Sequence, residues 1–385
     1  MKKFSGMDKM FAIRLLACLC LFVTALSCTN QPGKGSVIGT IDLGNLHERT
    51  FSWETLLGEN LKVIELQDTS KEYSFMEISK LVCWKDRIYI SDWKTRRIII
   101  FGQDGQPVSV LNRRGRGSEE YLQVSDFDVD DEGGIWVLDG QKDVIVHYSS
   151  EGKFLSQSKT GECQYSYISF DAGQLLLGVA LWDKTENSGY AAVLADTSFN
   201  VLARYGKKPD VYDPEFEFPN VGFSKVGKSI MLNTPIDDYV SVFEGKKYKG
   251  DYFFDFGGKR VPDEIRKSVE SNQDNIEKYS FLVNCSAVAG NVAFGTMMDC
   301  GTPVDFIVDM KKKEIYKQPV EGGKYHLISI SGDKVILSGM DEDSEQDIIV
   351  VTSVDSLQSN LDKQSYLCTL HICGGVQSLW NPGNM

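Results

Sequence analysis

The sequence predicts an all-β chain, a six-bladed β-propeller of four-stranded antiparallel blades, behind an export signal. Three observations lead to this fold class. A unit of short strands and turns recurs along the body of the chain. Glycine is frequent and proline sparse, 35 against 10, which suits many short strands joined by tight turns. With 42% hydrophobic and 25% charged residues, the chain can build a sizeable globular core.

The repeat is clearest in the first half of the body. The segment RIYISD (Arg87–Asp92) recurs as GIWVLD (Gly134–Asp139), and the turn Asp104-Gly105 recurs as Glu151-Gly152. Each unit contains a strand, a turn, a strand ending in Asp, a polar gap, a strand, an acidic-Gly turn and a last strand. Four antiparallel strands in about 45 residues are one propeller blade. Weaker second strands bring the units to six, at 175–180, 230–233, 292–296 and 335–339.

Two further segments complete the expected ring, a single domain over 46–385. PDEIRKSVESNQ (262–273) has Pro262 at its start and Ile265 and Val269 four residues apart, which predicts a short helical insertion. LKVIEL (61–66) precedes the first full blade. We expect it to complete the last blade, because ring closure removes free sheet edges. Its expected partners are the C-terminal strands around Ile348–Val351 and Tyr366–Cys373.

The N-terminus is a targeting segment. Residues 1–27 combine a basic start with the apolar run LLACLCLFVTALS (15–27), the layout of a signal peptide and too short for a membrane span. Ala25-Leu26-Ser27-Cys28 resembles a bacterial lipobox, although Ala25 replaces the usual Leu. We therefore expect a lipid on Cys28, with 28–45 as lipidated N-terminus and flexible tether. The alternative is an ordinary signal peptide cut near Ser27.

Six cysteines remain after the signal and the proposed anchor. An exported protein can form disulfides, but the spacings are irregular and most of these cysteines lie in apolar strands. Free, mainly buried thiols are the expectation for Cys83, Cys163, Cys285, Cys300, Cys368 and Cys373.

One stretch of the body resembles a known family. It contains RIYISD, RIIIFGQDGQPV, GRGSEEY (115–121), FDVDDEGGIWVLD and VIVHYSSEGKFL. This pattern resembles the six-bladed, NHL-like β-propeller lipoproteins of Bacteroidetes-type bacteria, in which a Gly-rich stretch ending in Glu-Tyr precedes the next blade. The resemblance implies the fold and an envelope location, and it implies no activity.

Charge and motifs limit the chemistry. The formal net charge is -13, so nucleic acid is not an expected partner, since phosphate binding needs a basic face. The acidic cluster from Asp126 to Glu132 lacks the Gly and the final carboxylate of a calcium loop and is interpreted as part of a strand–turn–strand unit, with 130–134 as the turn. His147, in the strand IVHY, is interpreted as a structural histidine. No metal site, cofactor or catalytic residue is predicted, and catalysis is left open, with a non-enzymatic role favoured.

Two features are candidate ligand contacts on the rim. Arg113, Arg114 and Arg116 form the one notable basic cluster and could contact an anion or carboxylate; the alternative is pairing with Glu119 and Glu120. Trp93 follows a strand-ending Asp, where an aromatic ring can stack on a ligand or pack between blades.

The sequence thus favours an envelope lipoprotein whose propeller is a binding or scaffold module for a protein, peptide or glycan. The alternative is a calcium-supported hydrolase resembling sugar-lactone-hydrolysing propellers, which needs Glu, Asn and Asp side chains converging in the central channel. A third reading is a purely structural part of an envelope complex. The expected place is the outer membrane, facing the periplasm and attached through Cys28, since no acidic run follows that cysteine; surface display stays open.

Overall fold

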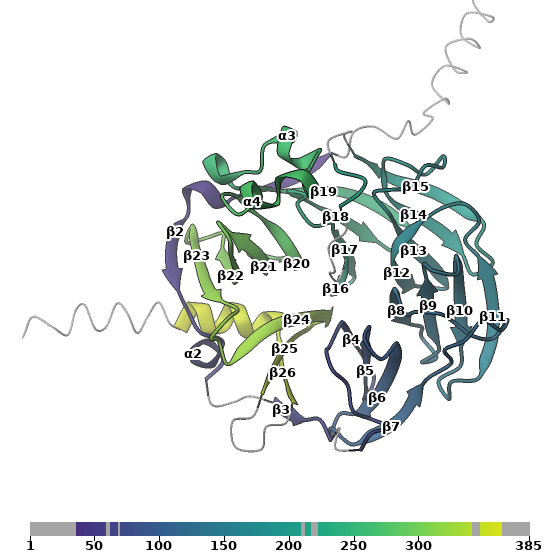
Figure 1. Cartoon of the computed structure of the whole chain (residues 1–385). Helices are drawn as coiled ribbons and strands as arrows, with labels where there is room; N and C mark the ends of the chain where they lie inside the picture. Colours follow the sequence, from purple (N-terminus) through teal and green to yellow (C-terminus); the bar gives the residue numbers. More distant parts are fainter. Residues whose placement is uncertain are drawn as a thin grey trace, which may run out of the picture.

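Six blades stand around a central axis in the computed structural model (Figure 1), and they form five hydrogen-bonded sheets within the described residues. The structure describes residues 36–58, 62–67, 70–208, 212–216, 222–340 and 347–363. The signal peptide, Cys28 and the expected strand at 366–373, with Cys368 and Cys373, lie outside these residues.

Each blade is an antiparallel meander that starts at the axis, as predicted. Blade 1 consists of β4 (Lys80–Trp84), β5 (Arg87–Asp92), β6 (Arg97–Gly102) and β7 (Pro107–Leu111). Blade 2 consists of β8 (Asp126–Val129), β9 (Ile135–Asp139), β10 (Val144–Tyr148) and β11 (Phe154–Lys159). Blade 3 consists of β12 (Tyr165–Asp171), β13 (Gln174–Val179), β14 (Tyr190–Asp196) and β15 (Val201–Lys207).

The second half of the ring follows the same order. Blade 4 consists of β16 (Phe223–Val226), β17 (Ser229–Asn233), β18 (Tyr239–Glu244) and β19 (Lys247–Asp255). Blade 5 consists of β20 (Ser280–Ala289), β21 (Val292–Asp299), β22 (Thr302–Asp309) and β23 (Glu314–Pro319). Blade 6 consists of β24 (Tyr325–Gly332), β25 (Lys334–Met340), β26 (Asp347–Ser353) and β3 (Lys62–Glu65). The four weaker strands predicted from the repeat are β13, β17, β21 and β25, each second in its blade.

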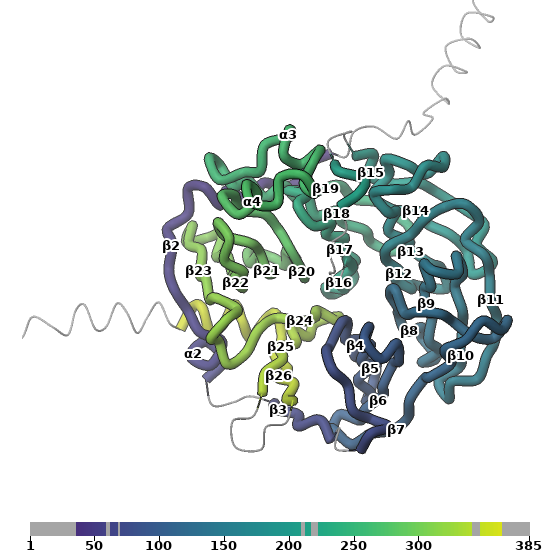
Figure 2. The backbone as a smooth tube through the Cα atoms, in the orientation of Figure 1, coloured from purple at the N-terminus to yellow at the C-terminus, as the bar shows by residue number. Residues whose placement is uncertain are grey.

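The N-terminal segment closes the ring and also wraps its outside. As predicted, β3 pairs antiparallel with β26 and becomes the outermost strand of blade 6. Before it, β1 (Val37–Asp42) pairs in parallel with β19, and β2 (His47–Thr50) pairs in parallel with β23. We call residues 37–58 and 62–65 the strap; Figure 2 shows it in purple along the outside of the ring.

The strap corrects the expected tether. The sequence predicts a flexible tether over 28–45. In the structure, residues 37–45 instead form β1 and the 3-10 helix η1 (Leu43–Asn45). The reason is that β1 gains backbone pairing along the edge of β19 and buries Ile41, which is 2% exposed. The short helix α2 (Trp53–Leu57) follows, with its Trp53 ring fully buried.

The predicted insertion at 262–273 is helical but broken into short pieces: α3 (Asp263–Arg266), the 3-10 helix η3 (Glu270–Asn272) and α4 (Gln273–Ile276). A further 3-10 turn, η2 (Gly257–Lys259), precedes them. One continuous helix does not form because the N–H of Glu270 donates to the carboxylate of Asp213 at 3.1 Å, outside the insertion. The guanidinium of Arg266 is also buried against Asp238.

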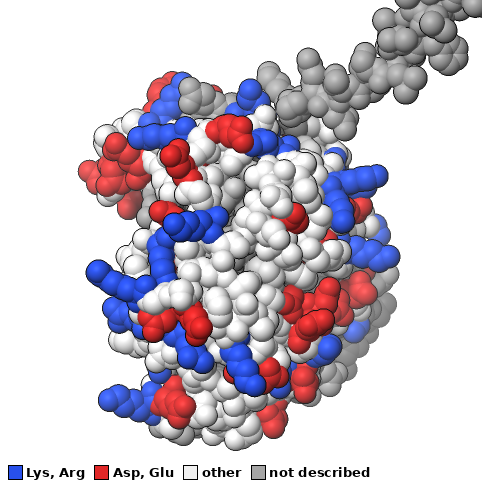
Figure 3. All heavy atoms as spheres, turned by 90° about the vertical axis from the view of Figure 1, so that its right-hand side faces the viewer, with Lys and Arg blue, Asp and Glu red and all other residues white. Residues whose placement is uncertain are grey.

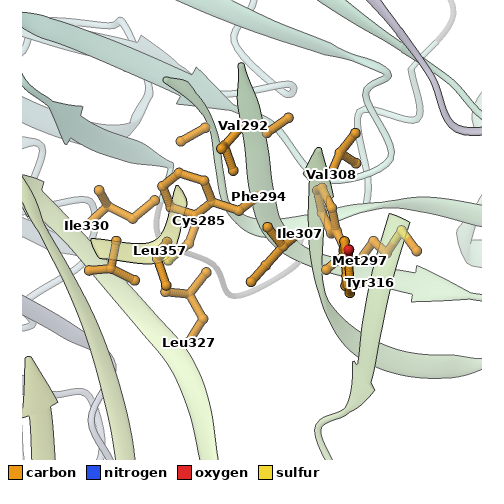
Figure 4. Close-up of a cluster of buried hydrophobic side chains, with 14 of the residues drawn as sticks. Cys285, Val292, Phe294, Met297, Ile307, Val308, Tyr316, Leu327, Ile330 and Leu357 are labelled. Carbon is orange, nitrogen blue, oxygen red and sulfur yellow. The ribbon is translucent and has the colours of Figure 1, made fainter. Parts of the chain in front are cut away.

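Buried apolar side chains fill the spaces between blades. The largest cluster joins blades 4, 5 and 6 to the strap. Figure 4 shows part of it, where Phe294 and Ile307 of blade 5 lie near Leu327 of blade 6. A helix over 354–363 follows β26 and buries Leu357 and Leu361 in the same cluster. None of the helices within the described ranges has the length and apolar character needed to cross a membrane.

Candidate functional site

The two faces of the ring differ in their connections. In a four-stranded meander, the links between blades lie on the same face as the links between second and third strands. This face, which we call the loop face, has the long connections 66–79, 112–125, 180–189, 208–222 and 256–279. The opposite turn face has tight turns such as 85–86, 172–173, 227–228, 245–246 and 290–291. Long loops on a rigid scaffold are where binding residues concentrate.

Aspartates at the ends of second strands hold the loop face in place. Asp92 accepts the backbone N–H of Lys94 in its own turn and of Met76 in the preceding connection, both at 2.9 Å. Asp139 accepts the N–H of Gln141 at 3.0 Å and of Leu122 at 2.6 Å in the same way. Asp183 repeats the pattern in blade 3 with Gln164 and Thr185. The Asp in the sequence repeat therefore joins each turn to the neighbouring connection.

Trp93 stands on the loop face of blade 1. Its side chain is 56% exposed, and Met76 beside the same turn is 70% exposed. The indole N–H donates to Glu77 at 3.0 Å, and Lys94 lies over the ring at 5.7 Å. Of the two predicted roles for Trp93, packing between blades does not fit this exposure, and an exposed contact surface does.

The three arginines lie elsewhere, on the outer rim between blades 1 and 2. All three are exposed, and Arg113 Nη2 donates to the carbonyl of Gly152 at 3.5 Å. Within the described part of the chain none of Arg113, Arg114 and Arg116 forms an ion pair, so the alternative pairing with Glu119 and Glu120 does not occur there. No contact in that part of the structure joins the arginines to Trp93.

The Gly-rich stretch that precedes blade 2 is built around Glu120. The carboxylate of Glu120 accepts the N–H of Gly117 at 2.7 Å, and a Cβ at Gly115 would lie 1.9 Å from its Oε2 atom. Lys142 of blade 2 donates to the carbonyl of Glu120 at 2.7 Å. Glycine at 115 thus makes room for the carboxylate that shapes this loop.

The central channel is lined by lysine–aspartate pairs. Lys80 of blade 1 pairs with Asp126 of blade 2 at 2.7 Å, and Lys225 of blade 4 pairs with Asp128 at 2.7 Å. The two carboxylates also accept the backbone N–H groups of Ile168 at 2.8 Å and Phe170 at 2.7 Å, on the inner edge of blade 3. These aspartates are occupied by structural partners.

The pKa values of the two channel aspartates move in opposite directions. Burial raises the pKa of Asp126 despite its ammonium partner Lys80. Burial also acts to raise the pKa of Asp128, but the nearby ammonium groups of Lys225 and Lys80 hold it below its ordinary value. Asp128 therefore stays ionised and keeps Lys225 at the channel.

The acidic cluster at 126–132 spans strand β8 and the turn 130–134 that follows it, as predicted. Asp130 accepts the N–H of Gly134 at 2.7 Å, the indole N–H of Trp136 at 3.1 Å and a hydrogen bond with His147 Nε2 at 2.9 Å. His147 stacks on Trp136 with 3.9 Å between ring centroids, and burial lowers its pKa. His147 therefore has the structural role expected of it. Within the described ranges no group of three or more His, Cys, Asp or Glu side chains could hold a metal ion.

A buried ion pair fixes the helical insertion on the loop face. Arg266 is 1% exposed and donates to Asp238, which is fully buried, at 2.5 Å; Arg260 donates to the same oxygen at 2.5 Å. Burial raises the pKa of Asp238 even so. Breaking such a pair leaves an uncompensated buried charge, so the insertion is held rigidly.

A pocket of about 230 Å³ opens between blades 2 and 3. One wall is apolar, with Leu177, Ala195, Phe199 and Val201. The other is polar, with Thr160, Glu162, Cys163, Tyr165, Thr185, Glu186 and Asn187. A second pocket of about 180 Å³ lies under the strap, between Leu43 and Leu46 and the blade 5 side chains of Asp299 and Lys317.

The cysteines of the described part are free thiols, as expected. Cys163 and Cys285 are buried, Cys83 is half-buried, and Cys300 is exposed. Cys163 accepts a hydrogen bond from Asn187 Nδ2 at 3.0 Å, and burial raises its pKa. Burial also raises the pKa of Cys83, to about 11. Burial thus keeps Cys163 and Cys83 mainly protonated at neutral pH, so they react slowly.

Sequence reasoning identified Trp93 and the arginines but missed the pocket between blades 2 and 3. Its residues come from four separate strands and three loops, none with a motif of its own. The Lys80 and Lys225 partners of the channel aspartates were missed for the same reason. The exposed Met76 beside Trp93 had no signal beyond being a large apolar residue in a polar connection.

Comparisons with known proteins agree with this fold. Residues 36–319 match the model of the DUF5128 family, described as a 6-bladed beta-propeller. A solved protein of Bacteroides fragilis, described as exported, is similar at TM-score 0.65 and 16% identity over 80% of this chain and 98% of that chain. A member of the duf4221 family from Bacteroides vulgatus is similar at TM-score 0.50 and 11% identity, over 77% and 98%. None of the curated proteins compared with it matches the sequence.

Proposed function

Because the chain belongs to the DUF5128 family of 6-bladed beta-propellers, we propose that it is an envelope module that binds a partner through its loop face. The observation that carries this proposal is the difference between the faces. The long connections gather on one face, while the other has tight turns. The Asp92, Asp139 and Asp183 hydrogen bonds fix those connections, which reduces the entropy that binding would cost.

The partner is a protein, a peptide or a glycan. Trp93 and Met76 offer an exposed aromatic and an exposed flexible apolar side chain on the loop face. Trp is enriched at the centres of interfaces, and Met adapts its shape to a partner. Lys94 and Glu77 surround the indole with one charge of each sign, an arrangement that suits a polar rim around an apolar contact.

Photo-crosslinking in cells tests the loop face directly. A photoreactive amino acid replaces Met76 in the full chain, and the matched control carries it at Lys228, in a tight turn of the turn face. We expect a defined adduct from position 76 only, and Trp93→Ala should reduce it. Equal adducts from both positions, or none from position 76, would contradict binding through the loop face.

The module is tethered by a lipid on Cys28, in the manner of the NHL-like propeller lipoproteins it resembles. The support is the signal-like segment 1–27, which ends in the lipobox-like sequence Ala25-Leu26-Ser27 directly before Cys28. An acidic chain with net charge -13 is repelled by anionic lipid, so a covalent anchor would keep it at the membrane. We place it at the outer membrane, facing the periplasm.

Labelling with an alkyne fatty acid tests the anchor. The wild type is expected to incorporate label and to sediment with the outer membrane, whereas Cys28→Ala does neither. A labelled, membrane-bound Cys28→Ala protein would refute lipidation at Cys28. Protease added to intact cells tests the side: an intact propeller supports the periplasmic face, and digestion shows surface display.

The channel argues for a binding module rather than the calcium-supported hydrolase. A hydrolase of that kind needs open carboxylates in the channel, but Asp126 and Asp128 are paired with Lys80 and Lys225. Turnover of a sugar lactone that depends on calcium and stops with EDTA would reverse this preference.

A further inference from the structure

We propose that the pocket between blades 2 and 3 binds a lysine side chain of a basic polypeptide segment. Three of its lining residues come from the loop-face connection 180–189, but it uses neither Trp93 nor Met76 of blade 1. Its test is therefore separate from the test of Trp93. The pocket belongs to the side of the molecule on which β11 and β15 lie. Figure 3 shows that side, with clusters of both charges around a broad uncharged area.

The apolar wall fits the stem of lysine. Ala195 pairs with Val201 across β14 and β15, so both side chains lie on the sheet face that looks towards blade 2. Leu177 and Phe199 continue this wall. The volume of about 230 Å³ exceeds the roughly 150 Å³ that accommodates a benzene ring in an apolar cavity. Four methylene groups can therefore lie against the wall.

The pocket lining also includes a carboxylate for the ammonium group. Of its two acids, Glu186 is engaged by Arg204, which also donates to Asn187 at 2.6 Å. Glu162 is exposed and forms no ion pair within the described part of the chain. Lysine carries a compact ammonium group on a flexible stem, so the ammonium can reach one carboxylate while the stem lies in the apolar slot.

The polar groups at the floor need no ligand. Asn187 donates to Cys163 at 3.0 Å and accepts from Arg204, while Thr185 donates to Asp183 at 2.8 Å. A sugar would need such groups to be open to its hydroxyls, so a neutral sugar fits less well. A basic partner also agrees with the net charge of -13, which attracts cationic segments.

Cys163 supplies the readout, because it is 6% exposed and lines the pocket. The full exported chain is alkylated with iodoacetamide at low salt, and modification of Cys163 is followed by mass spectrometry. The probe is Nα-acetyl-lysine methylamide, compared with its Nε-acetyl and norleucine analogues. We expect only the lysine compound to slow the alkylation of Cys163, with Cys300 unaffected.

Two variants and a matched control locate the site. Glu162→Gln should weaken protection about threefold, as expected for one exposed charge pair, and 0.5 M salt should do the same. Val201→Phe blocks the mouth and should abolish protection. Leu202→Phe, also exposed but in the bulge of β15 and not lining the pocket, should leave it unchanged.

Several results would overturn the proposal. Equal protection by norleucine would mean that the ammonium is not recognised, and protection by a neutral sugar alone would mean another ligand class. No protection by the lysine compound at millimolar concentration, with circular dichroism confirming the fold, would also refute it.

Discussion

Replacing Asp305 by Asn should make the propeller more stable at neutral pH. Asp305 lies in β22 and is completely buried. Its carboxylate accepts the indole N–H of Trp53 and the backbone N–H of Leu327, both at 2.8 Å, and the hydroxyl of Thr296 at 2.8 Å. These bonds join the strap, blade 5 and blade 6, but no cation pairs with the carboxylate there. Burial raises its pKa from 3.8 to about 6.

The size and sign of the effect follow from that shift. Because the folded pKa lies above the unfolded one, the folded state holds a proton between about pH 4 and pH 6 that the unfolded chain has already lost. Stability from this group is therefore highest below pH 4 and falls as the pH rises through 6. Two pKa units correspond to ~3 kcal/mol. An Asn amide has the same shape, accepts from Trp53 and Leu327, and donates to the Thr296 oxygen.

Urea unfolding of residues 29–385 at several pH values measures the effect. We expect Asp305→Asn to exceed the wild type by up to ~3 kcal/mol at pH 7.5, with the difference shrinking towards pH 4. Asp305→Ala is the control, because it also lacks the titrating group but leaves two N–H groups without an acceptor; it should be less stable than Asp305→Asn by ~2–4 kcal/mol at every pH. A difference between wild type and Asp305→Asn that stays flat from pH 4 to 8 would refute the reasoning.

Three further substitutions test the ring. Lys80→Met leaves Asp126 buried without its cation and should cost ~3–5 kcal/mol in urea unfolding; a neutral result would mean that Asp126 is protonated in the folded state. Gly105→Ala would put a Cβ 1.8 Å from the carbonyl oxygen of Glu65, at a residue whose φ is +76°. It should loosen β3 and so lower the melting temperature. Amide hydrogen exchange should become faster in blades 1 and 6 only. Ile41→Ala removes a buried strap side chain and should cost ~2–4 kcal/mol; an unchanged unfolding midpoint would show that β1 does not contribute to stability.

The blades could be predicted because their signals are local. Arg87–Asp92 and Gly134–Asp139 repeat a pattern that ends in an Asp, and the structure shows why: the carboxylates of Asp92 and Asp139 bind the turn and the preceding connection. Gly115 also has a local explanation in the carboxylate of Glu120. The aspartate requirement recurs in blades 1 and 2, where the sequence repeat is clearest.

Apart from β3, the strap could not be predicted, and neither could the channel pairs and the pocket, because each depends on residues far apart in the chain. Trp53 and Asp305 are 252 residues apart when they form their hydrogen bond. The parallel pairing of β2 with β23 uses backbone groups, which leave no mark in the side-chain pattern. Trp93 was identified by its position after Asp92, but its exposure could be read only from the structure.

The strap also sets the order in which the protein can mature. Its three strands leave the ribosome first, whereas their partners β19, β23 and β26 are among the last strands synthesised. Until Asp347–Ser353 is available, β3 has no neighbour and blade 6 cannot be finished. Closing such long loops slows folding, so any truncated nascent chain that stops short of β26 exposes unpaired edges to proteases. Closing the ring therefore requires the chain to be made at least as far as β26, because blade 6 combines β3 from the start of the described residues with β26 from near their end.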